Sequence, residues 1–240
     1  MDIKNIKKEF PIFKQKINGK PLVYLDSANS SQKPKVVIDK ISSFYETEYS
    51  NVGRSVHTLA VKATNRFEAT RDKIQKYLNA KHREEIIFTK GATEAINLVA
   101  SSYGKKYIKK GDEVLITELE HHSNYVPWNY LRTDKGAVIK FAQVNKNGDV
   151  EIDEIKKLIT NKTKIIAITH ISNVTGAILP ITKIVDLAKE KNIPVLVDGT
   201  QGAPHSEIDM QKMGCDFYAI SCHKMYGPNG LGVLYMKKKW

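Results

Sequence analysis

From about residue 85 onward, short apolar runs alternate with segments whose apolar residues recur at helical spacing. The runs that predict strands are residues 85–89, 113–117, 138–144, 164–170, 195–199, 216–221 and 232–236. The segments that predict helices are residues 93–108, part of 123–135, 153–159 and 181–192. Strands that are apolar on both faces and alternate with amphipathic helices indicate a buried sheet that is mainly parallel. The pattern therefore predicts an α/β fold with flanking helices.

The first 80 residues follow a different pattern. After an irregular start they hold two long helical patterns, at residues 34–49 and 59–79. The chain has no repeats and no low-complexity linker. We therefore expect residues 1–80 to form an N-terminal arm with helices, packed beside an α/β body of residues 81–240.

Composition excludes some classes of protein. A hydrophobic fraction of 41% and an aromatic fraction of 8% fit a soluble globular protein. No apolar run approaches the roughly 20 residues that span a bilayer, and the charged start has no signal-peptide core. The two cysteines, Cys215 and Cys222, match neither a disulfide framework nor a zinc spacing. We expect reduced thiols, a cytoplasmic location and no membrane partner.

The net charge of +12 invites a nucleic-acid interpretation. The basic residues are mostly lysines spread along the predicted helix faces, and no aromatic RNA-binding motif or helix-turn-helix accompanies them. We therefore expect no nucleic-acid partner.

Polar and glycine-rich segments follow five of the predicted strands. These segments are KGATE, ELEHHSN, ISNVTG, DGTQG and CHKMYGPNG. Ligands of open α/β sheets bind beyond the carboxyl ends of the strands. The candidate chemistry is therefore expected at this one edge of the sheet.

Lys224 and Asp198 are the leading candidates at that edge. Lys224 follows an apolar strand and precedes a Gly/Pro loop that lets backbone approach closely, whereas most lysines are solvated surface charges. An amine held at such an edge can have a lowered pKa and form a Schiff base. Asp198 ends an apolar run, where a buried carboxylate needs a partner. A nearby cation or helix end would serve, and so would a pyridinium nitrogen, which with a Schiff-base lysine is the pairing used for pyridoxal phosphate.

Other motifs at the edge leave alternatives open. Thr93 begins a predicted helix, where it suits either a phosphate site or an ordinary N-cap. Adjacent His121 and His122 lack an evident third metal ligand, so His121 is either a structural histidine or a ring that stacks on an aromatic group. The GPNGLG spacing differs from the dinucleotide fingerprint, and a strand follows it, so we reject that interpretation.

Taken together, these segments resemble one family. YLDSANSSQKP, NVGRSVHTLA, TKGATEAINLVA, ELEHHSNYVPW, ITHISNVTGAILP, VLVDGTQGAPH and CDFYAISCHKMYGPNGLGVLY occur in order over nearly all of the chain. The chain resembles the pyridoxal-phosphate enzymes of the class V aminotransferase fold, in particular the Suf-type cysteine desulfurase and selenocysteine lyase group. The resemblance implies fold type I of these enzymes, with residues 81–240 as the large domain that binds pyridoxal 5'-phosphate and residues 1–80 as part of the small-domain and interface region.

The resemblance also implies roles for individual residues. Lys224 corresponds to the lysine that holds the cofactor and later moves the Cα proton, and His121 to the ring that stacks on the cofactor and assists proton transfer. Asp198 corresponds to the partner of the pyridine nitrogen. Gln201 corresponds to the hydrogen-bond donor to the phenolic oxygen, with Asn173 nearby on the substrate side. The implied phosphate ligands are Thr93, Ser221 and His223.

The chain departs from the family pattern in three residues. Ala92 stands where a threonine is common, Gly53 where a histidine precedes the arginine, and Cys222 where a glycine is common. Family members also continue well beyond this point. The resemblance therefore implies that most of the C-terminal small domain, the persulfide cysteine and the arginine for the substrate carboxylate lie outside these residues. We expect neither Cys215 nor Cys222 to replace that cysteine.

The function that the resemblance implies is a desulfurase that converts L-cysteine to L-alanine and passes sulfur to an enzyme cysteine for iron–sulfur cluster assembly. It also implies a homodimer at full length and a Suf-type sulfur acceptor protein. The alternatives are a selenocysteine or cysteine sulfinate lyase, a class V aminotransferase, or a non-catalytic truncated form that binds only cofactor or a partner.

Overall fold

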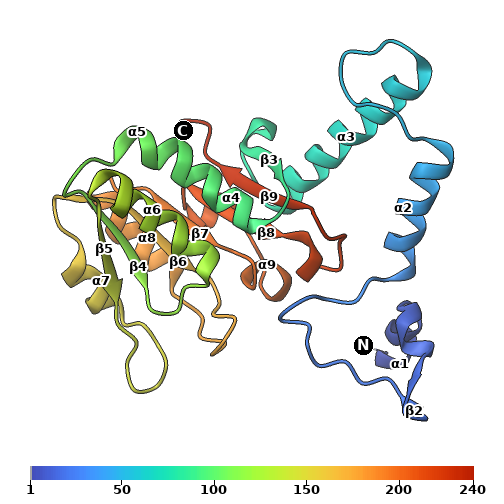
Figure 1. The fold of residues 1–240 in the computed structure, drawn as a ribbon, viewed down its shortest axis with the longest axis horizontal. Coiled ribbons are helices and arrows are strands. Elements are labelled where there is room, and N and C mark those ends of the chain that lie inside the picture. The colour runs from blue at the N-terminus through green and yellow to red at the C-terminus, as the bar shows by residue number, and fades with distance from the viewer. Residues whose placement is uncertain (1) are drawn as a thin grey trace.

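The N-terminal arm lies to one side of the sheet in this computed structural model, which describes residues 2–240 (Figure 1). The arm contains α1 (Ile3–Lys8), η1 (Pro11–Lys14), a hairpin of β1 (Lys16–Ile17) and β2 (Lys20–Pro21), α2 (Lys35–Thr47) and α3 (Thr58–Tyr77). The two long helices confirm the predicted helical patterns. The short hairpin and α1 lie before residue 34, in the segment for which the sequence predicted no regular structure.

A seven-stranded sheet forms the body. Its strands are β3 (Ile86–Thr89), β4 (Glu113–Thr117), β5 (Val138–Ala142), β6 (Thr163–Thr169), β7 (Val195–Asp198), β8 (Phe217–Ser221) and β9 (Gly232–Met236). Their order in the sheet is β3-β9-β8-β7-β6-β4-β5. β9 pairs antiparallel with both of its neighbours, and the other pairs are parallel. The mainly parallel sheet is therefore confirmed, with one antiparallel strand inserted.

Helices cover both faces of this sheet (Figure 1). They are α4 (Ala92–Val99), α5 (Lys105–Tyr107), α6 (Val126–Lys135), α7 (Ile152–Leu158), α8 (Ile181–Glu190), α9 (Gly202–His205) and α10 (Met210–Met213). Short 3₁₀ turns lie at η2 (Arg83–Glu85), η4 (His122–Asn124) and η5 (Cys222–Lys224). The fold type is the one that the sequence predicts, and the predicted element boundaries agree to within a few residues.

The helix predicted at residues 93–108 is interrupted by a π-helical turn, η3 (Ala100–Gly104). The hydroxyls of Ser101 and Ser102 both bond back to the Leu98 carbonyl, at 3.2 and 2.5 Å. Such bonds from serine to the preceding turn bend helices. The irregularity therefore has a local cause that apolar periodicity does not register.

The core consists of two layers of apolar side chains, one on each face of the sheet. Ile166, Ile168 and Val197 pack in one layer, and Ile116, Ile165 and Leu196 pack in the other. Every residue of β4, β7 and β8 is buried. Adjacent residues of one strand thus enter opposite layers, which explains why the strands read as continuous apolar runs.

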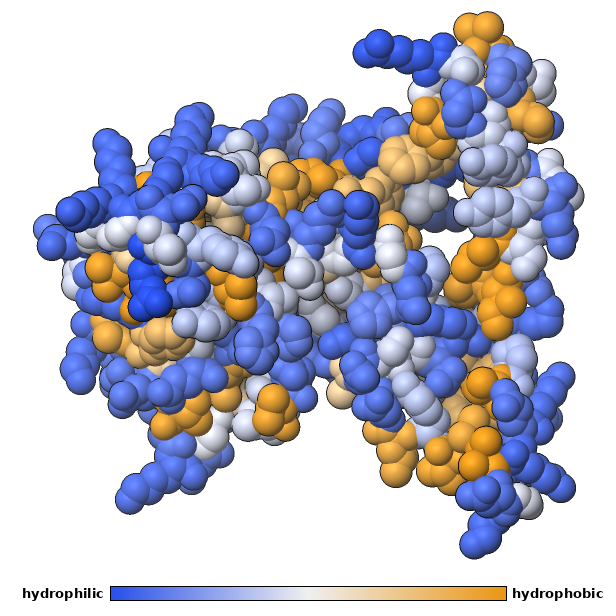
Figure 2. All heavy atoms as spheres, in the orientation of Figure 1, coloured by the Kyte–Doolittle hydropathy of each residue, from blue (hydrophilic) through white to orange (hydrophobic). Residues whose placement is uncertain are grey.

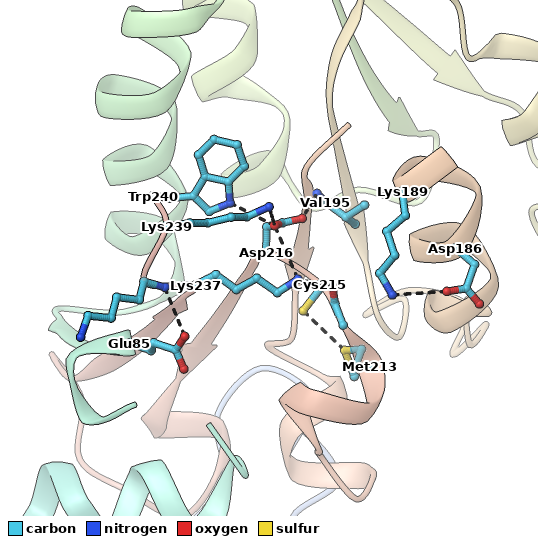
Figure 3. A network of polar contacts seen from close by, with 12 residues as sticks. Glu85, Asp186, Lys189, Val195, Met213, Cys215, Asp216, Lys237, Lys239 and Trp240 are labelled. Atoms are coloured by element: carbon cyan, nitrogen blue, oxygen red, sulfur yellow. Dashed lines mark hydrogen bonds and ion pairs between the residues drawn. The ribbon is translucent and has the colours of Figure 1, made fainter. Parts of the chain in front are cut away.

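The amino edge of the sheet carries a network of charged side chains around Asp216 (Figure 3). Asp216, which precedes β8, accepts hydrogen bonds from the Val195 N–H at 3.1 Å and Trp240 Nε1 at 3.0 Å. The ammonium groups of Lys239 and Lys237 lie 3.0 and 3.6 Å from its Oδ1. These contacts join the starts of β7 and β8 to the segment after β9.

The arm exposes many apolar side chains. α2 has no buried residue, and apolar side chains gather over the arm helices in Figure 2. Those more than half exposed there include Val36, Tyr45, Tyr49 and Val56. Within residues 2–240, no helix is both long and apolar enough to cross a membrane.

Candidate active site

All eight predicted site residues line one cavity of about 190 Å³ at the carboxyl edge of the sheet. The predicted residues in its wall are Thr93, His121, Asn173, Asp198, Gln201, Ser221, His223 and Lys224. They come from the segments after β3, β4, β6, β7 and β8, the five strand ends that the sequence singled out. The cavity therefore forms where the sheet topology brings these segments together.

Lys224 stands in the short turn η5, directly after β8, and is half-buried. Burial lowers the pKa of its amine below the usual lysine value, and the negative charge of Asp198 opposes that shift. A lowered pKa increases the fraction of neutral, nucleophilic amine near neutral pH. The amine thus has the property that covalent attachment of a carbonyl compound needs.

Asp198 is the last residue of β7 and is 4% exposed. Its carboxylate accepts one hydrogen bond, from the Thr200 N–H at 3.0 Å. Across residues 2–240, no lysine, arginine or histidine forms an ion pair with it. A buried carboxylate is costly without a cationic or multiply hydrogen-bonded partner, so the site is arranged to receive one.

A second buried polar group points to the same conclusion. The Thr200 hydroxyl is buried without a hydrogen-bond partner in the described chain, and Thr200 lines the cavity. Buried hydroxyls are nearly always hydrogen-bonded, and an unpaired one indicates a missing ligand or water. Asp198 and Thr200 therefore form one patch of unused hydrogen-bonding capacity.

Two glycines shape the turn that carries this patch. A Cβ on Gly199 would lie 1.9 Å from the ring of Tyr218, and one on Gly202 would lie 2.2 Å from the ring of His170. These two rings are joined by a hydrogen bond of 2.9 Å between His170 Nδ1 and the Tyr218 hydroxyl. The DGTQG segment therefore needs glycines to pack closely on this aromatic pair.

The start of α4 forms another wall. The Ser221 hydroxyl accepts a hydrogen bond from the Ala92 N–H at 2.8 Å, which joins the end of β8 to the first turn of α4. A Cβ on Gly232 would lie 2.5 Å from the Cα of Gly91, so only glycine permits β9 to approach this loop. Free N–H groups at a helix start favour an anion.

His223 faces the same end of the cavity as Thr93 and Ser221. Burial lowers the pKa of its imidazole, and the positive charges of Lys224 and Lys33 lower it further. The ring is therefore predominantly neutral at pH 7, with one nitrogen that donates and one that accepts.

His121 precedes η4 and is oriented by Ser123. The Ser123 N–H donates to His121 Nδ1 at 3.1 Å, and the Ser123 hydroxyl lies 2.8 Å from the same nitrogen. In the neutral ring this contact leaves the proton on Nε2. His121 thus presents a ring with a fixed tautomer to the cavity.

Glu120, which precedes His121, holds this loop through hydrogen bonds to neighbouring residues. The sequence did not single it out. Its carboxylate accepts from the Thr117 hydroxyl and the Asn124 amide, each at 2.6 Å, and from the Thr169 N–H at 2.9 Å. Burial raises the pKa of this carboxyl to about 8, against the opposing effect of these hydrogen bonds. Glu120 therefore ties together the ends of β4 and β6.

Gln201 is buried, and its amide donates to the Ala28 carbonyl at 2.6 Å. Asn173, after β6, is exposed at the mouth of the cavity. The cavity wall also includes Ala92, noted in the sequence as a departure from the family pattern, and residues that the sequence did not single out: Asn29, Ser123, Thr169, Ile171 and Thr200. Most of these are close neighbours of predicted residues at the strand ends. Asn29 lies in the arm, where no strand end indicated it.

Both cysteines are free and lie outside the cavity wall. Burial raises the pKa of Cys215 to about 12, and it raises the pKa of the half-buried Cys222 as well. Since the thiolate is the nucleophile, both thiols are poorly reactive at neutral pH.

The residues around the cavity fit pyridoxal phosphate. A lysine amine of lowered pKa lines the same cavity as a buried carboxylate without an ion-pair partner in residues 2–240, and a helix start with hydroxyl and imidazole neighbours suits a phosphate. The unpaired Thr200 hydroxyl is a further polar group for such a ligand.

Comparison with known proteins gives consistent results. The chain is 50% identical over 238 residues to a probable cysteine desulfurase of Halalkalibacterium halodurans, which covers 99% of this chain and 59% of that protein. It is 44% identical to a cysteine desulfurase of Synechococcus elongatus, over 99% of this chain and 38% of that protein.

Solved structures show the same resemblance. The cysteine desulfurase CsdA of Escherichia coli aligns with a TM-score of 0.88 at 37% identity, over 100% of this chain and 59% of that chain. The cysteine desulfurase of Thermococcus onnurineus aligns with a TM-score of 0.91 at 33% identity, over 99% and 57%. The chain thus spans little more than half the length of these structures. Residues 23–240 match the family described as Aminotransferase class-V, and the chain belongs to that family.

Proposed function

We propose that these residues form the cofactor-binding part of a pyridoxal-phosphate-dependent cysteine desulfurase. The reaction converts L-cysteine to L-alanine and transfers sulfur to an enzyme cysteine, for use in iron–sulfur cluster assembly. The observation that carries the proposal is that one cavity holds both the Lys224 amine, whose pKa burial lowers, and the buried Asp198 carboxylate, which has no ion-pair partner in residues 2–240. The named cysteine desulfurases among the relatives support the choice of substrate.

Each residue of the cavity receives a role. Bound pyridoxal phosphate supplies an electron sink for the electron pair that remains when the substrate Cα loses its proton. Asp198 keeps a proton on the pyridine nitrogen. The Lys224 amine would hold the cofactor, and its Nζ would be the atom that takes up the Cα proton of the substrate. Its burial favours the neutral form that this transfer needs.

The remaining residues bind and orient. The His121 ring would stack on the cofactor, and it would exchange a proton at Nε2, because Ser123 occupies Nδ1. Gln201 and Asn173 bind near the phenolic oxygen. The phosphate is held at the start of α4, where it contacts Thr93, Ser221 and His223. Ala92 carries no side-chain hydroxyl, and its N–H donates to the Ser221 hydroxyl, which it orients at this end of the cavity.

We also propose the larger organisation. Residues 81–240 act as the cofactor-binding large domain, and residues 1–80 belong to the small-domain and interface region. The complete protein works in the cytoplasm as a homodimer and delivers sulfur to a Suf-type acceptor protein. The nucleophilic cysteine is neither Cys215 nor Cys222, since burial raises the pKa of both thiols.

A product assay tests the proposed reaction. The protein, expressed from its complete reading frame, is incubated with L-cysteine and a thiol reductant, and alanine and sulfide are measured together. We expect both products in equal amounts, no product with Lys224→Ala, and retained turnover with Cys215→Ser and Cys222→Ser.

Parallel reactions separate the alternatives. Faster turnover of L-selenocysteine or L-cysteine sulfinate would identify a different lyase. Amino-group transfer to a keto acid would identify an aminotransferase. Absence of turnover with all of these substrates would contradict an enzymatic function.

A further inference from the structure

The turn that carries Lys224 is held from outside by residues 28–33 of the N-terminal arm, here called the clamp. The carbonyl of His223, directly before Lys224, accepts four hydrogen bonds from it. The three shorter ones come from the Ser31 N–H at 3.0 Å, the Ser31 hydroxyl at 2.9 Å and the Lys33 ammonium at 2.8 Å, and the longest comes from the Ser30 hydroxyl at 3.4 Å. A carbonyl has two lone pairs, so this oxygen is saturated by contacts from a segment about 190 residues away in the sequence.

Ser31 holds the other flank of Lys224 as well. Its hydroxyl oxygen accepts a hydrogen bond from the Tyr226 N–H at 2.8 Å while it donates to His223. Tyr226 has a φ of 64°, which is uncommon for a bulky residue and needs surrounding contacts to persist. The buried Ser31 side chain therefore bridges the residues before and after Lys224.

The clamp is more firmly attached than the helix that follows it. Lys33 also donates to the Ser31 carbonyl at 2.7 Å, and the Ala28 carbonyl accepts from the cavity residue Gln201 at 2.6 Å. α2 begins two residues after Lys33 and has no buried side chain. The buried residue of the clamp, Ser31, is thus buried against the turn that carries Lys224, whereas α2 packs no side chain into an apolar core.

We propose that Ser31 and Lys33 are positioning residues that fix the turn of residues 222–226 and thereby set where the Lys224 amine stands in the cavity. The inference rests on the proposed function for its catalytic consequence. The Lys33 ammonium neutralises the partial charge of a carbonyl next to Lys224, and the Ser31 hydroxyl prevents Tyr226 from relaxing. Release of the clamp lets the turn move and moves the amine with it.

Amide hydrogen exchange tests the geometric part without any cofactor. In Ser31→Ala the Tyr226 N–H loses its acceptor, and we expect its exchange to be about fivefold faster or more, the equivalent of one lost hydrogen bond. Ser27→Ala is the matched control, because Ser27 is an exposed serine in the preceding segment. Unchanged Tyr226 exchange in Ser31→Ala would overturn the proposal.

Steady-state kinetics with L-cysteine test the catalytic part. We expect Lys33→Met to lower kcat by about tenfold to a hundredfold through misplacement of the amine, with KM changed by less than about twofold. Lys33→Arg, which keeps a cation at this place, is expected to recover most of kcat. Lys35→Met is the control, since Lys35 is exposed and pairs with Asp39.

Two outcomes separate this inference from the proposed function. Wild-type protein without turnover, but with Tyr226 exchange that responds to Ser31→Ala, would contradict the proposed function and leave the clamp in place. Active Lys33→Met enzyme with wild-type kcat and a lowered melting temperature would reduce Lys33 to a structural role and overturn its assignment as a positioning residue.

Discussion

Both edges of the central sheet bury a carboxylate, but the two carboxylates differ in how many protein groups contact them. At the amino edge, Asp216 is 6% exposed and is contacted by two lysines, an indole N–H and a backbone N–H (Figure 3). At the carboxyl edge, Asp198 is 4% exposed, and within residues 2–240 its carboxylate accepts a hydrogen bond only from the Thr200 N–H. The two residues lie at opposite ends of neighbouring strands.

The number of protein partners distinguishes the two carboxylates: that of Asp216 has a structural role, and that of Asp198 is available to a ligand. Burial costs both groups comparable desolvation energy, and at Asp216 the protein's own cations and donors offset it. At Asp198 the protein supplies one donor and leaves the rest of the carboxylate open to the cavity. Buried groups with unbalanced charge in a cleft are typical of functional sites.

Matched amide substitutions give the largest contrast between the edges. We expect Asp198→Asn to lower desulfurase turnover by about 10²–10³-fold, because a charge that stabilises the reacting state is lost. The unfolding free energy of the cofactor-free variant should stay unchanged or rise, since an unpaired buried charge is removed. We expect Asp216→Asn to lower the unfolding free energy by about 2 kcal/mol, through loss of charge-assisted hydrogen bonds, with cofactor binding retained.

Urea unfolding and turnover assays on the two variants measure this contrast. If Asp198→Asn destabilises the protein as much as Asp216→Asn does, then Asp198 is also a structural group and the distinction between the edges fails.

Buried threonines provide a smaller test of the same contrast. Thr163, at the amino edge, donates to Glu113 at 3.1 Å, whereas the Thr200 hydroxyl has no partner in residues 2–240. We expect Thr163→Val to lower the unfolding free energy of the cofactor-free protein by about 1 kcal/mol, and Thr200→Val to leave it unchanged or to raise it. Thermal melts of both variants, with and without pyridoxal phosphate, would show whether Thr200→Val instead weakens cofactor binding.

Acid titration is expected to show the smallest effect. Burial opposes ionisation of Glu113, but hydrogen bonds from Thr160, Lys140 and Thr163 outweigh it and lower the pKa of this carboxyl. Because the pKa of Glu113 is lower in the folded state than the usual value of 4.5, its ionised carboxylate stabilises the folded protein above pH 4.5. This stabilisation is lost as the pH falls from 4.5 through the lower pKa of the folded state. Glu113→Gln should therefore flatten the decline in unfolding free energy below pH 4.5. An unchanged decline would show that other groups cause it.

Sequence patterns predicted the body well. Strands such as residues 113–117 and 232–236 were predicted with their observed bounds, because continuous apolar runs bounded by polar segments are strong signals. The rule that ligands bind beyond the carboxyl ends of strands then identified the five segments that form the cavity. Asp198 was recognisable because it ends an apolar run, where a buried carboxylate needs a partner, and Lys224 because it lies between an apolar run and a Gly/Pro loop at the same edge of the sheet.

The contacts between distant segments were not predictable in the same way. Pairing of Ser31 and Lys33 with the His223 carbonyl joins parts of the chain about 190 residues apart, and no periodic pattern encodes it. The open hydrogen-bonding capacity of Thr200 depends on which neighbours approach it in three dimensions. The apolar run of β9 by itself does not show its antiparallel direction, although the Gly/Pro loop of residues 222–231 is too short for the crossover that joins parallel neighbours.

The most direct test of the account is chemical identification of the lysine that holds the cofactor. The protein is loaded with pyridoxal phosphate, treated with borohydride to fix the cofactor to its amine, and digested for peptide mass spectrometry. We predict the added mass on the peptide that contains Lys224, and its disappearance in Lys224→Ala. Label on Lys33, the other lysine whose pKa burial lowers, or on no lysine at all, would contradict the account.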